Sequence, residues 1–406
     1  MKYIEIEGGI SSSKGFKSNG VHAGIRKNKN KLDVGLIYCE KECVAAAVYT
    51  KNKVKGAPLI VTKENLQDDK AKAIIVNSGN ANTCNVDGIE KANLMCEFVA
   101  KSLKIDKKDV IVASTGVIGQ NLDTDVIEKA MPELVNGLSK DGSDKFAQSI
   151  MTTDTIKKEV AIEFELDGVK CHIGAVAKGS GMINVNMATL LCFVTTDINI
   201  TPEVMKYLIK DVNEDTLNMI NIDGDTSTND MLVIMSSCLA GNKEINKIDD
   251  KYFEVAGLFK EVLSTIAKLI AGDGEGATKL IECKCLQAPS ILAAKAIASE
   301  VVSSNLLKAA MFAADANWGR VLCAVGNAQA DFDVANMSVA FKSKAGEITV
   351  CQKGVGIPFS EDEAKQILLE KEICIIVDLN SGKNMATAWG CDLTYDYVKI
   401  NAEYRT

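Results

Sequence analysis

The stretch VAIEFELDGVKCHIGAVA, residues 160–177, alternates apolar and polar residues on both sides of Asp167-Gly168. Apolar side chains recur at every second position from Val160 to Leu166 and again from Val169 onward. A period of two is typical of strands with one buried face, and Asp-Gly favours a two-residue hairpin turn. We therefore predict an antiparallel hairpin over these residues.

Further strand and helix patterns flank this hairpin. Strand patterns that end in Gly/Asn or Thr-Gly turns occupy 72–88 and 109–119, and a second hairpin is expected over 337–354. Thr201-Pro202 is a helix start signal, and an amphipathic helix is expected from about Asp250 to Ile270. Interleaved helices and antiparallel hairpins indicate a mixed α/β (α+β) fold, a layered sandwich of mixed sheets with helices outside.

Composition and charge exclude several protein classes. The 406 residues are 47% hydrophobic, and the formal net charge of -8 comes with lysines that are spread among acids. A nucleic-acid partner needs a concentrated basic surface, which this pattern does not provide. No apolar stretch approaches the roughly 20 residues of a membrane helix. The N-terminus lacks the apolar core of a signal peptide, so we expect a cytoplasmic protein that has no membrane partner.

Thirteen cysteines and two histidines limit the chemistry further. No CxxC motif occurs, and most cysteines lie in apolar runs, so we expect reduced core cysteines and no metal site. His172 lies in the alternating run of the predicted hairpin, and His22 has no recognisable partner near it in sequence. An enzyme with this sequence is therefore expected to activate its nucleophile without histidine.

The segment KGSGMINVNMATLLCFVTTD, residues 178–197, leads from a lysine and two glycines through Ala188-Thr189 into an apolar strand. A threonine hydroxyl is a weak nucleophile and needs a base. Cleavage of the chain just before Thr189 provides one, because the new α-amine has an ordinary pKa of about 7.7–8.0. On spacing alone, Thr189 also fits an ordinary strand threonine.

Three other motifs have both a functional and a structural interpretation. Thr115-Gly116 follows a strand pattern and fits either an oxyanion site or a plain turn. Glu275 in GDGEG fits either an acid that faces an amine substrate or a solvated residue at a helix end. IDGDTSTND, residues 222–230, begins like a calcium loop but lacks the glycine and the final glutamate of such loops.

Taken together, the ordered motifs cover essentially the whole chain and resemble the ornithine acetyltransferase family, the glutamate N-acetyltransferases of arginine biosynthesis. The motifs that carry this resemblance are GGISSSKGFKSNGVHAGI (8–25), VNSGNANTCNVDG (76–88), STGVIG (114–119), MTTDT (151–155), KGSGMI with MATLL, GDGEGATK (272–279), DANWGR (315–320) and the terminal YVKINAEYRT.

The resemblance implies self-cleavage between Ala188 and Thr189, giving an α chain of residues 1–188 and a β chain of residues 189–406 that fold together. Thr189 would then accept acetyl from N2-acetylornithine and pass it to glutamate. Thr115 and Gly116 would form the oxyanion hole. The implied substrate-binding residues, which include members of a C-terminal strand, are Thr152, Lys178, Thr189, Glu275, Asn401 and Thr406.

The same resemblance bears on cofactors and assembly. It implies no cofactor, and acetyl-CoA stays open as a second acetyl donor, since some members also start the pathway. It further implies an assembly of two α and two β chains. One position departs from the family, because Val185 stands where a proline is common three residues before the Ala-Thr pair. The loss of that rigid kink predicts slower processing.

Two alternatives from other functional classes stay open at this point. The first is an aminopeptidase or amidase with an N-terminal nucleophile, in which water takes the acyl group. The second is a non-catalytic protein that binds amino acids in the same pocket. The transferase predicts two chains and transfer to glutamate, the hydrolase predicts transfer to water, and the binding protein predicts one intact chain.

Overall fold

The computed structural model describes residues 1–184 and 190–403. The chain divides into two compact units. The first comprises Met1–Gly179, Asn186–Glu214 and Thr226–Ile266, and the second comprises Ser180–Val185, Asp215–Asp225 and Ala267–Thr406. The predicted cleavage point after Ala188 therefore does not coincide with a boundary between the units.

The first unit is built on a mixed sheet with the strand order β1-β6-β7-β8-β10-β3-β4-β5, and β2 pairs with β3 outside this path. Its strands are β1 (Tyr3–Glu5), β2 (Phe16–Val21), β3 (Val34–Tyr49), β4 (Lys70–Asn80), β5 (Val110–Val117), β6 (Lys158–Leu166), β7 (Val169–Lys178), β8 (Leu191–Thr196) and β10 (Met231–Ser236). The predicted hairpin is confirmed, because β6 and β7 pair antiparallel around Asp167-Gly168. Both turn residues have positive φ, at 54° and 78°.

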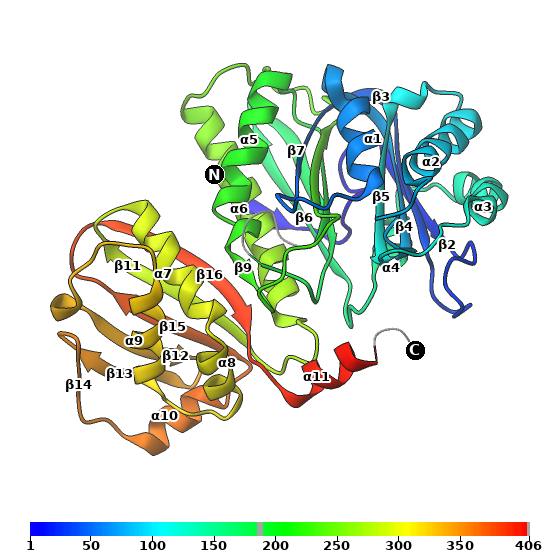
Figure 1. The fold of residues 1–406 in the computed structure, drawn as a ribbon. Coiled ribbons are helices and arrows are strands. Elements are labelled where there is room, and N and C mark those ends of the chain that lie inside the picture. Colours follow the sequence, from blue (N-terminus) through cyan, green and yellow to red (C-terminus); the bar gives the residue numbers. More distant parts are fainter. Residues whose placement is uncertain (185–189, 404–406) are drawn as a thin grey trace. The chain divides into compact units, whose positions relative to one another are not determined.

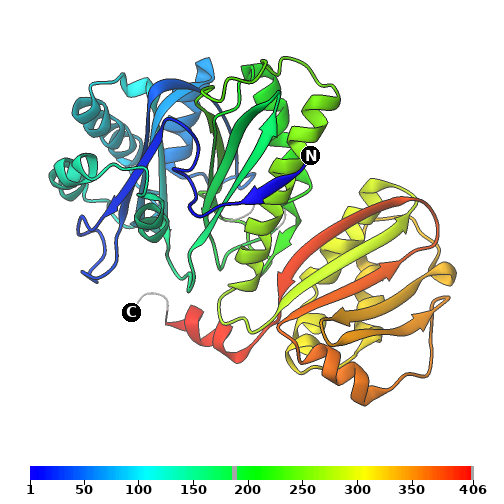
Figure 2. The ribbon, with the colours of Figure 1, turned by 180° about the vertical axis from the view of Figure 1, so that it is seen from behind.

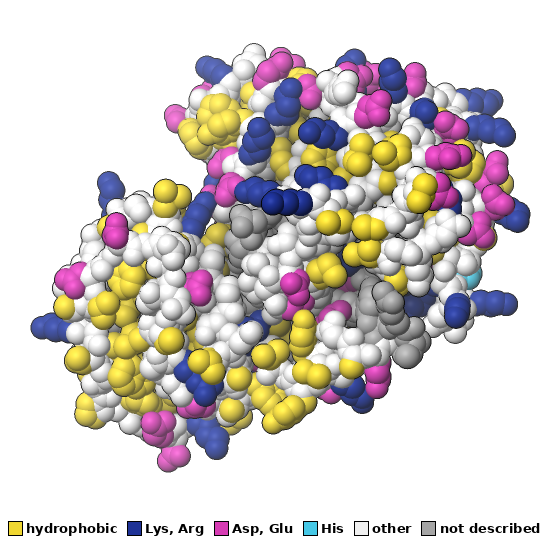
Figure 3. All heavy atoms as spheres, in the orientation of Figure 1, with side chains coloured by type: hydrophobic (Ala, Val, Ile, Leu, Met, Phe, Trp, Pro, Cys, Tyr) yellow, Lys and Arg dark blue, Asp and Glu magenta, His cyan; other side chains and the backbone are white. Residues whose placement is uncertain are grey.

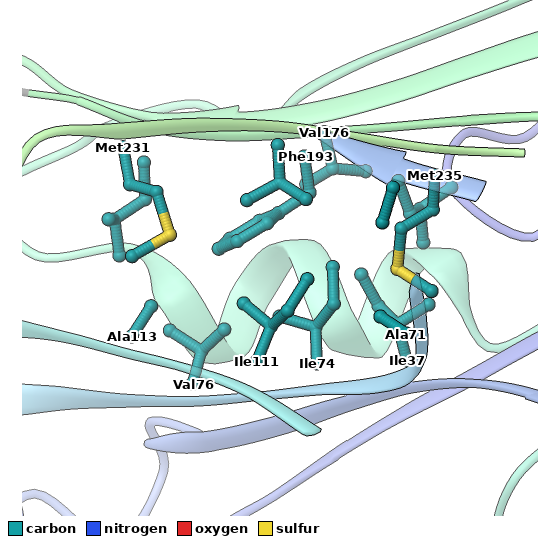
Figure 4. Packing of buried hydrophobic residues seen from close by; sticks show 14 of the residues in the cluster. Ile37, Ala71, Ile74, Val76, Ile111, Ala113, Val176, Phe193, Met231 and Met235 are labelled. Atoms are coloured by element: carbon teal, nitrogen blue, oxygen red, sulfur yellow. The ribbon is translucent and has the colours of Figure 1, made fainter. Parts of the chain in front are cut away.

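The strands of this sheet form two layers that enclose a hydrophobic core. Phe193, Val176 and Met231 point from one layer toward Ile74 and Ile111 of the other (Figure 4). The long strand β3 belongs to both layers, since its first half pairs with β2 and its second half with β10. Every residue of β8 and β10 is buried, which explains why these strands read as continuous apolar runs.

Helices cover the outer faces of the two layers, except that α4 contributes Phe146, Ala147 and Ile150 to the core between them. The helices of this unit are α1 (Ala57–Asn65), α2 (Gly88–Leu103), α3 (Thr124–Asn136), α4 (Ser143–Ile150), α5 (Pro202–Glu214) and most of α6 (Asp250–Gly272), with short 3-10 turns at Leu66–Asp68 and Lys107–Asp109. A second core packs α2 and α3 against β3, β4 and β5. In Figure 1, α2 and α3 lie on the side of β4 and β5, whereas α5 lies on the side of β7. The predicted layered sandwich with outer helices is confirmed.

The second unit is built on a sheet with the strand order β14-β13-β12-β15-β11-β16-β9. Its strands are β9 (Ile220–Asn221), β11 (Leu280–Ala288), β12 (Ser338–Ser343), β13 (Gly346–Gln352), β14 (Val355–Gly356), β15 (Glu372–Asp378) and β16 (Asn384–Cys391). Its helices are α7 (Ile291–Ser303), α8 (Asn305–Phe312), α9 (Trp318–Asn327), α10 (Glu361–Leu368) and α11 (Tyr395–Ala402), with 3-10 turns at Leu217–Met219 and Val334–Asn336. Helices α7 and α9 cover one face of this sheet, and Figure 2 shows the opposite face.

Two local expectations were wrong. The tail was expected as a strand, but Asn401 lies in helix α11. Tyr395 and Tyr397 mimic strand alternation, yet Asp396 lies in the first turn of the helix, where acidic residues are favourable. The Thr-Gly pair was expected in a turn, but Thr115 and Gly116 lie inside β5 at an irregular register with β4.

Other global expectations can be compared with the described residues. No helix within them is long and apolar enough to cross a membrane. All thirteen cysteines are free thiols, and most are buried, as the apolar runs predicted. Burial raises the pKa of the Cys96 thiol to about 12, so this core cysteine stays protonated. On the face shown in Figure 3, Lys and Arg side chains are interspersed with Asp and Glu.

Candidate active site

Three strand ends meet at Lys178, Leu191 and Met231. Lys178, the last residue of β7, lies opposite Leu191, the first residue of β8. Leu191 in turn lies beside Met231, the first residue of β10, because β8 and β10 are parallel. Ala188, Thr189 and Val185 lie outside the described residues. The described chain resumes at Leu190, whose carbonyl accepts the backbone N–H of Met231 at 3.0 Å.

A buried carboxylate, Asp154, organises one side of this region. Its Oδ1 accepts Lys158 Nζ at 2.7 Å and the Gly179 amide at 2.7 Å, while its Oδ2 accepts the Thr152 amide at 2.8 Å. Burial opposes its ionisation, but Lys178 and Lys158 hold the pKa of the Asp154 carboxyl well below its usual range. The predicted residues Thr152 and Lys178 are therefore joined through a carboxylate that the sequence did not single out.

A pocket lies beside this carboxylate. It has a volume of about 610 Å³, which is within the usual range for small-molecule sites. The residues that line it are Arg26, Asn30, Lys31, Leu32, Gln148, Met151, Asp154, Thr155, Ile156 and Lys157. Cationic and apolar side chains are both present, so the pocket suits a small molecule that carries a carboxylate.

Thr115 and Gly116 occupy a bulge near the end of β5. Gly116 has φ 134°, and a Cβ at this position would lie 2.3 Å from the backbone carbon of Gly79. A residue with a side chain cannot occupy this position without moving the backbone of β4. Thr115, the residue before this glycine, is 9% exposed. The bulge is therefore a suitable place for an oxyanion site.

Asn229 links this bulge to the start of β10. Its Nδ2 donates to the carbonyls of Ala81 at 2.7 Å and Ser114 at 2.9 Å, and its Oδ1 accepts the hydroxyl of Thr83 at 2.6 Å. Ser114 directly precedes Thr115, and Asn229 lies two residues before Met231. The side chain thus holds the candidate oxyanion residues at the strand ends that carry Leu190 and Lys178.

Two predicted residues of the second unit are also brought together. Asn401 Nδ2 donates to Glu275 Oε2 at 2.8 Å, and the Glu275 amide donates to the Ser180 carbonyl at 2.7 Å. A Cβ on Gly181 would lie 2.5 Å from the Glu275 carboxyl carbon, so the glycine makes room for this carboxylate. Glu275 is therefore held by Asn401 and the neighbouring backbone. Thr406 lies outside the described residues.

Each of the two histidines lies beside a described oxygen acceptor. His172 Nδ1 lies 2.7 Å from Asp197 Oδ2, and this hydrogen bond raises the pKa of the imidazole. His22 Nδ1 lies 2.8 Å from the Lys31 carbonyl oxygen. Among the described residues, no group of three or more His, Cys, Asp or Glu side chains is arranged to hold a metal ion.

Asp154 and Asn229 were missed from the sequence, although each lies in a motif that was noted. Asp154 belongs to MTTDT, and Asn229 belongs to the segment read as an incomplete calcium loop. Three partners of the Asn229 side chain, Ala81, Thr83 and Ser114, lie 115 to 148 residues away along the chain, so local spacing does not reveal them. The density of short polar residues in TSTND was the available signal for a buried hydrogen-bond network.

Comparisons with known proteins identify the family of the chain. A model described as the ArgJ family matches residues 17–406. Arginine biosynthesis bifunctional protein ArgJ 1 of Clostridium acetobutylicum is 47% identical over 392 residues, which cover 96% of each chain. The corresponding protein of Caldanaerobacter subterraneus is 46% identical over 402 residues and 99% of each chain. A crystal structure of the Bacillus halodurans protein, 40% identical, covers 52% of this chain and 97% of its own, with a TM-score of 0.49. The resemblance expected from the motifs is confirmed, and the chain belongs to the ArgJ family.

Proposed function

We propose that this protein is an ornithine acetyltransferase that moves acetyl from N2-acetylornithine to glutamate in arginine biosynthesis. The observation that carries the proposal is the meeting of Lys178, Leu190 and Met231 at three strand ends, with Thr115-Gly116 tied to them by Asn229. The family relationship favours acetyl transfer over the aminopeptidase and the amino-acid-binding alternatives.

The proposed chemistry begins with cleavage of the peptide bond between Ala188 and Thr189. The Thr189 oxygen attacks the Ala188 carbonyl carbon, the peptide C–N bond breaks to leave an ester, and water hydrolyses that ester. In turnover the same oxygen attacks the acetyl carbonyl carbon of N2-acetylornithine, and the new α-amine takes the hydroxyl proton. That proton passes to the leaving nitrogen of ornithine. Glutamate nitrogen then attacks the acetyl-threonine ester and restores the hydroxyl.

The remaining predicted residues receive roles from their chemistry. The Thr115 hydroxyl and the Gly116 amide stabilise the negative charge on the carbonyl oxygen during both acyl transfers. We propose that Lys178 pairs with the substrate α-carboxylate and that Glu275, held by Asn401, receives the cationic end of ornithine. Thr152 contacts the substrate next to the pocket beside Asp154, and Thr406 completes the predicted set.

The assembly and the location are part of the same proposal. Two α chains (1–188) and two β chains (189–406) form the active enzyme, and a native mass measurement tests that number. The free cysteines are typical of a reducing compartment, so we place the reaction in the cytoplasm. Whether acetyl-CoA also donates is tested by its ability to replace N2-acetylornithine.

Denaturing mass spectrometry and acceptor kinetics test the proposal directly. Purified protein should give two chains, the second beginning at Thr189, and T189A should remain a single chain of 43.5 kDa without transfer activity. Initial-rate plots of N2-acetylornithine against glutamate should be parallel, as a covalent intermediate requires. Acetate release without acetylglutamate would support the hydrolase, and an intact, inactive wild-type chain would support the binding protein.

A further inference from the structure

A half-buried carboxylate, Asp223, anchors the segment 180–184 within the second unit. Asp223 Oδ2 accepts the backbone N–H of Met182, and its Oδ1 accepts that of Ile183 at 2.9 Å. In the opposite direction, the Ile183 carbonyl accepts the Ile222 amide at 2.8 Å. One side chain therefore holds two consecutive amides of a segment that is neither helix nor strand.

The backbone conformation of Met182 depends on such an anchor. Its φ is 56°, in the left-handed region, where the Cβ of a residue other than glycine crowds the following carbonyl oxygen. Its side chain is 42% exposed, so packing does little to hold the residue in this conformation. The hydrogen bond from the Met182 amide to Asp223 offsets part of the cost.

A second anchor lies next to the first. Asn184 Nδ2 donates to the Gly224 carbonyl at 2.7 Å, and Asn184 Oδ1 accepts Asn221 Nδ2 at 2.8 Å. Both partners belong to the segment 221–224, which also contains Asp223. Residues 182–184 are therefore tied to this segment by side chains from both sides.

The anchored segment also contacts Glu275. The Ser180 carbonyl accepts the Glu275 amide at 2.7 Å. A Cβ on Gly181 would lie 2.5 Å from the Glu275 carboxyl carbon, so the backbone of this glycine borders the carboxylate directly. Ser180 and Gly181 immediately precede Met182. The position of the Glu275 carboxylate therefore depends on the residues that Asp223 holds.

We propose that Asp223 is a positioning residue for Glu275 and acts through residues 180–183. This inference rests on the proposed function, in which Glu275 receives the cationic end of ornithine. A carboxylate that is held in place before the substrate arrives loses little conformational freedom on binding, so its contact with an ammonium contributes more to affinity. Without the anchor, Met182 relaxes to an ordinary φ and the backbone beside Glu275 shifts.

The first test compares two acetyl donors in D223N. Asparagine has an NH₂ group where one oxygen of Asp223 accepts a backbone N–H, so the anchor is weakened. KM for N2-acetylornithine should rise about 10-fold, because a contact to a charged group is impaired, while kcat changes by less than about twofold. N2-acetylnorvaline has the same carbon chain without the terminal amine, and its kcat/KM should stay unchanged.

The matched control is D225N. It removes one negative charge from the same turn, but the Asp225 side chain is exposed. KM for N2-acetylornithine should therefore stay close to the wild-type value. An increase as large as that in D223N would assign the effect to net charge and contradict the proposal.

The second test is a double-mutant cycle between Asp223 and Glu275. E275Q alone should raise KM for N2-acetylornithine, and D223N should add no further increase in the E275Q background, because both changes affect one contact. Independent, additive increases would show that Asp223 acts elsewhere. N184A weakens only the second anchor and should raise KM less than D223N, so it keeps the test available if D223N does not fold.

The outcomes distinguish this inference from the proposed function. An unchanged KM in E275Q would remove the role proposed for Glu275, and the inference with it. A raised KM in E275Q, together with unchanged values in D223N and N184A, would reject the inference alone. An equal loss of kcat/KM for both donors in D223N would assign Asp223 to the fold in general. A D223N chain that stays uncut, beside a cut wild type, would assign it to processing instead.

Discussion

Substitution of Asp154 by Asn should destabilise the first unit strongly. Lys158 Nζ lies 2.7 Å from Asp154 Oδ1, and both side chains are 0% exposed. Removing one partner of a buried ion pair costs about 3–5 kcal/mol, because a charge stays in a medium that solvates it poorly. At about 2–4 °C per kcal/mol for a domain of 150–250 residues, the melting temperature should fall by about 6–20 °C.

The chain supplies a matched control in the preceding lysine. Lys157 pairs with Asp144, but these side chains are 37% and 50% exposed. Exposed pairs contribute about 0–1 kcal/mol, so D144N should shift the melting temperature by no more than a few degrees. Thermal unfolding of the three proteins at pH 7, followed by circular dichroism and by calorimetry, measures both effects.

The pH dependence of the same variants checks the cause. The pKa of Asp154 is depressed in the folded chain, so its stabilisation is present above the ordinary carboxyl pKa and is lost as pH falls through the lower folded value. The gap between wild type and D154N should therefore be complete at pH 7 and begin to close only below about pH 4. The reasoning would be refuted if the melting temperatures of D154N and D144N differed by less than about two degrees at pH 7. Two degrees correspond to a difference of roughly 1 kcal/mol in the free energy of unfolding.

Three further predictions concern the site and its surroundings. T115A should lower turnover by about 10²–10³-fold with little loss of stability, since only one oxyanion donor is removed; full activity would exclude the bulge as that site. G181A should raise KM for N2-acetylornithine, because its Cβ would lie 2.5 Å from the Glu275 carboxyl carbon, whereas G257A on α6, with nothing within 4 Å, should not. H172Q should cost most stability near pH 6 and least near pH 9, because Asp197 raises the imidazole pKa and the stabilisation is lost as pH rises through it; a gap that does not depend on pH would contradict this.

The sequence predicted those parts of the fold that depend on local pattern. The hairpin at Asp167-Gly168 was correct because strand period and turn chemistry lie in adjacent residues. The tail was wrong because eight residues with two tyrosines at alternate positions fit both a strand and a helix, and none of them is buried to decide between the two. Short, exposed segments carry too little hydrophobic pattern to fix their secondary structure.

The sequence predicted several residues of the candidate site, but not the hydrogen bonds that hold them together. Thr115, Thr152 and Lys178 were identified through motifs, whereas the side chains that join them, Asp154 and Asn229, depend on pairings between distant segments. The Asn229 side-chain amide donates a hydrogen bond to the carbonyl of Ser114, which lies 115 residues away in the sequence.

The antiparallel pairing of β7 with β8 affects how the protein refolds after denaturation. A cut after Ala188 would leave these neighbouring strands, and the core beneath them, on two different polypeptides. Folding before the cut is unimolecular, but recovery after denaturation would require two fragments to meet in solution, so its rate would depend on concentration. Each molecule would thus fold as one chain only once, before it is cut. After the cut, the lifetime of the folded protein would be set by its rate of unfolding.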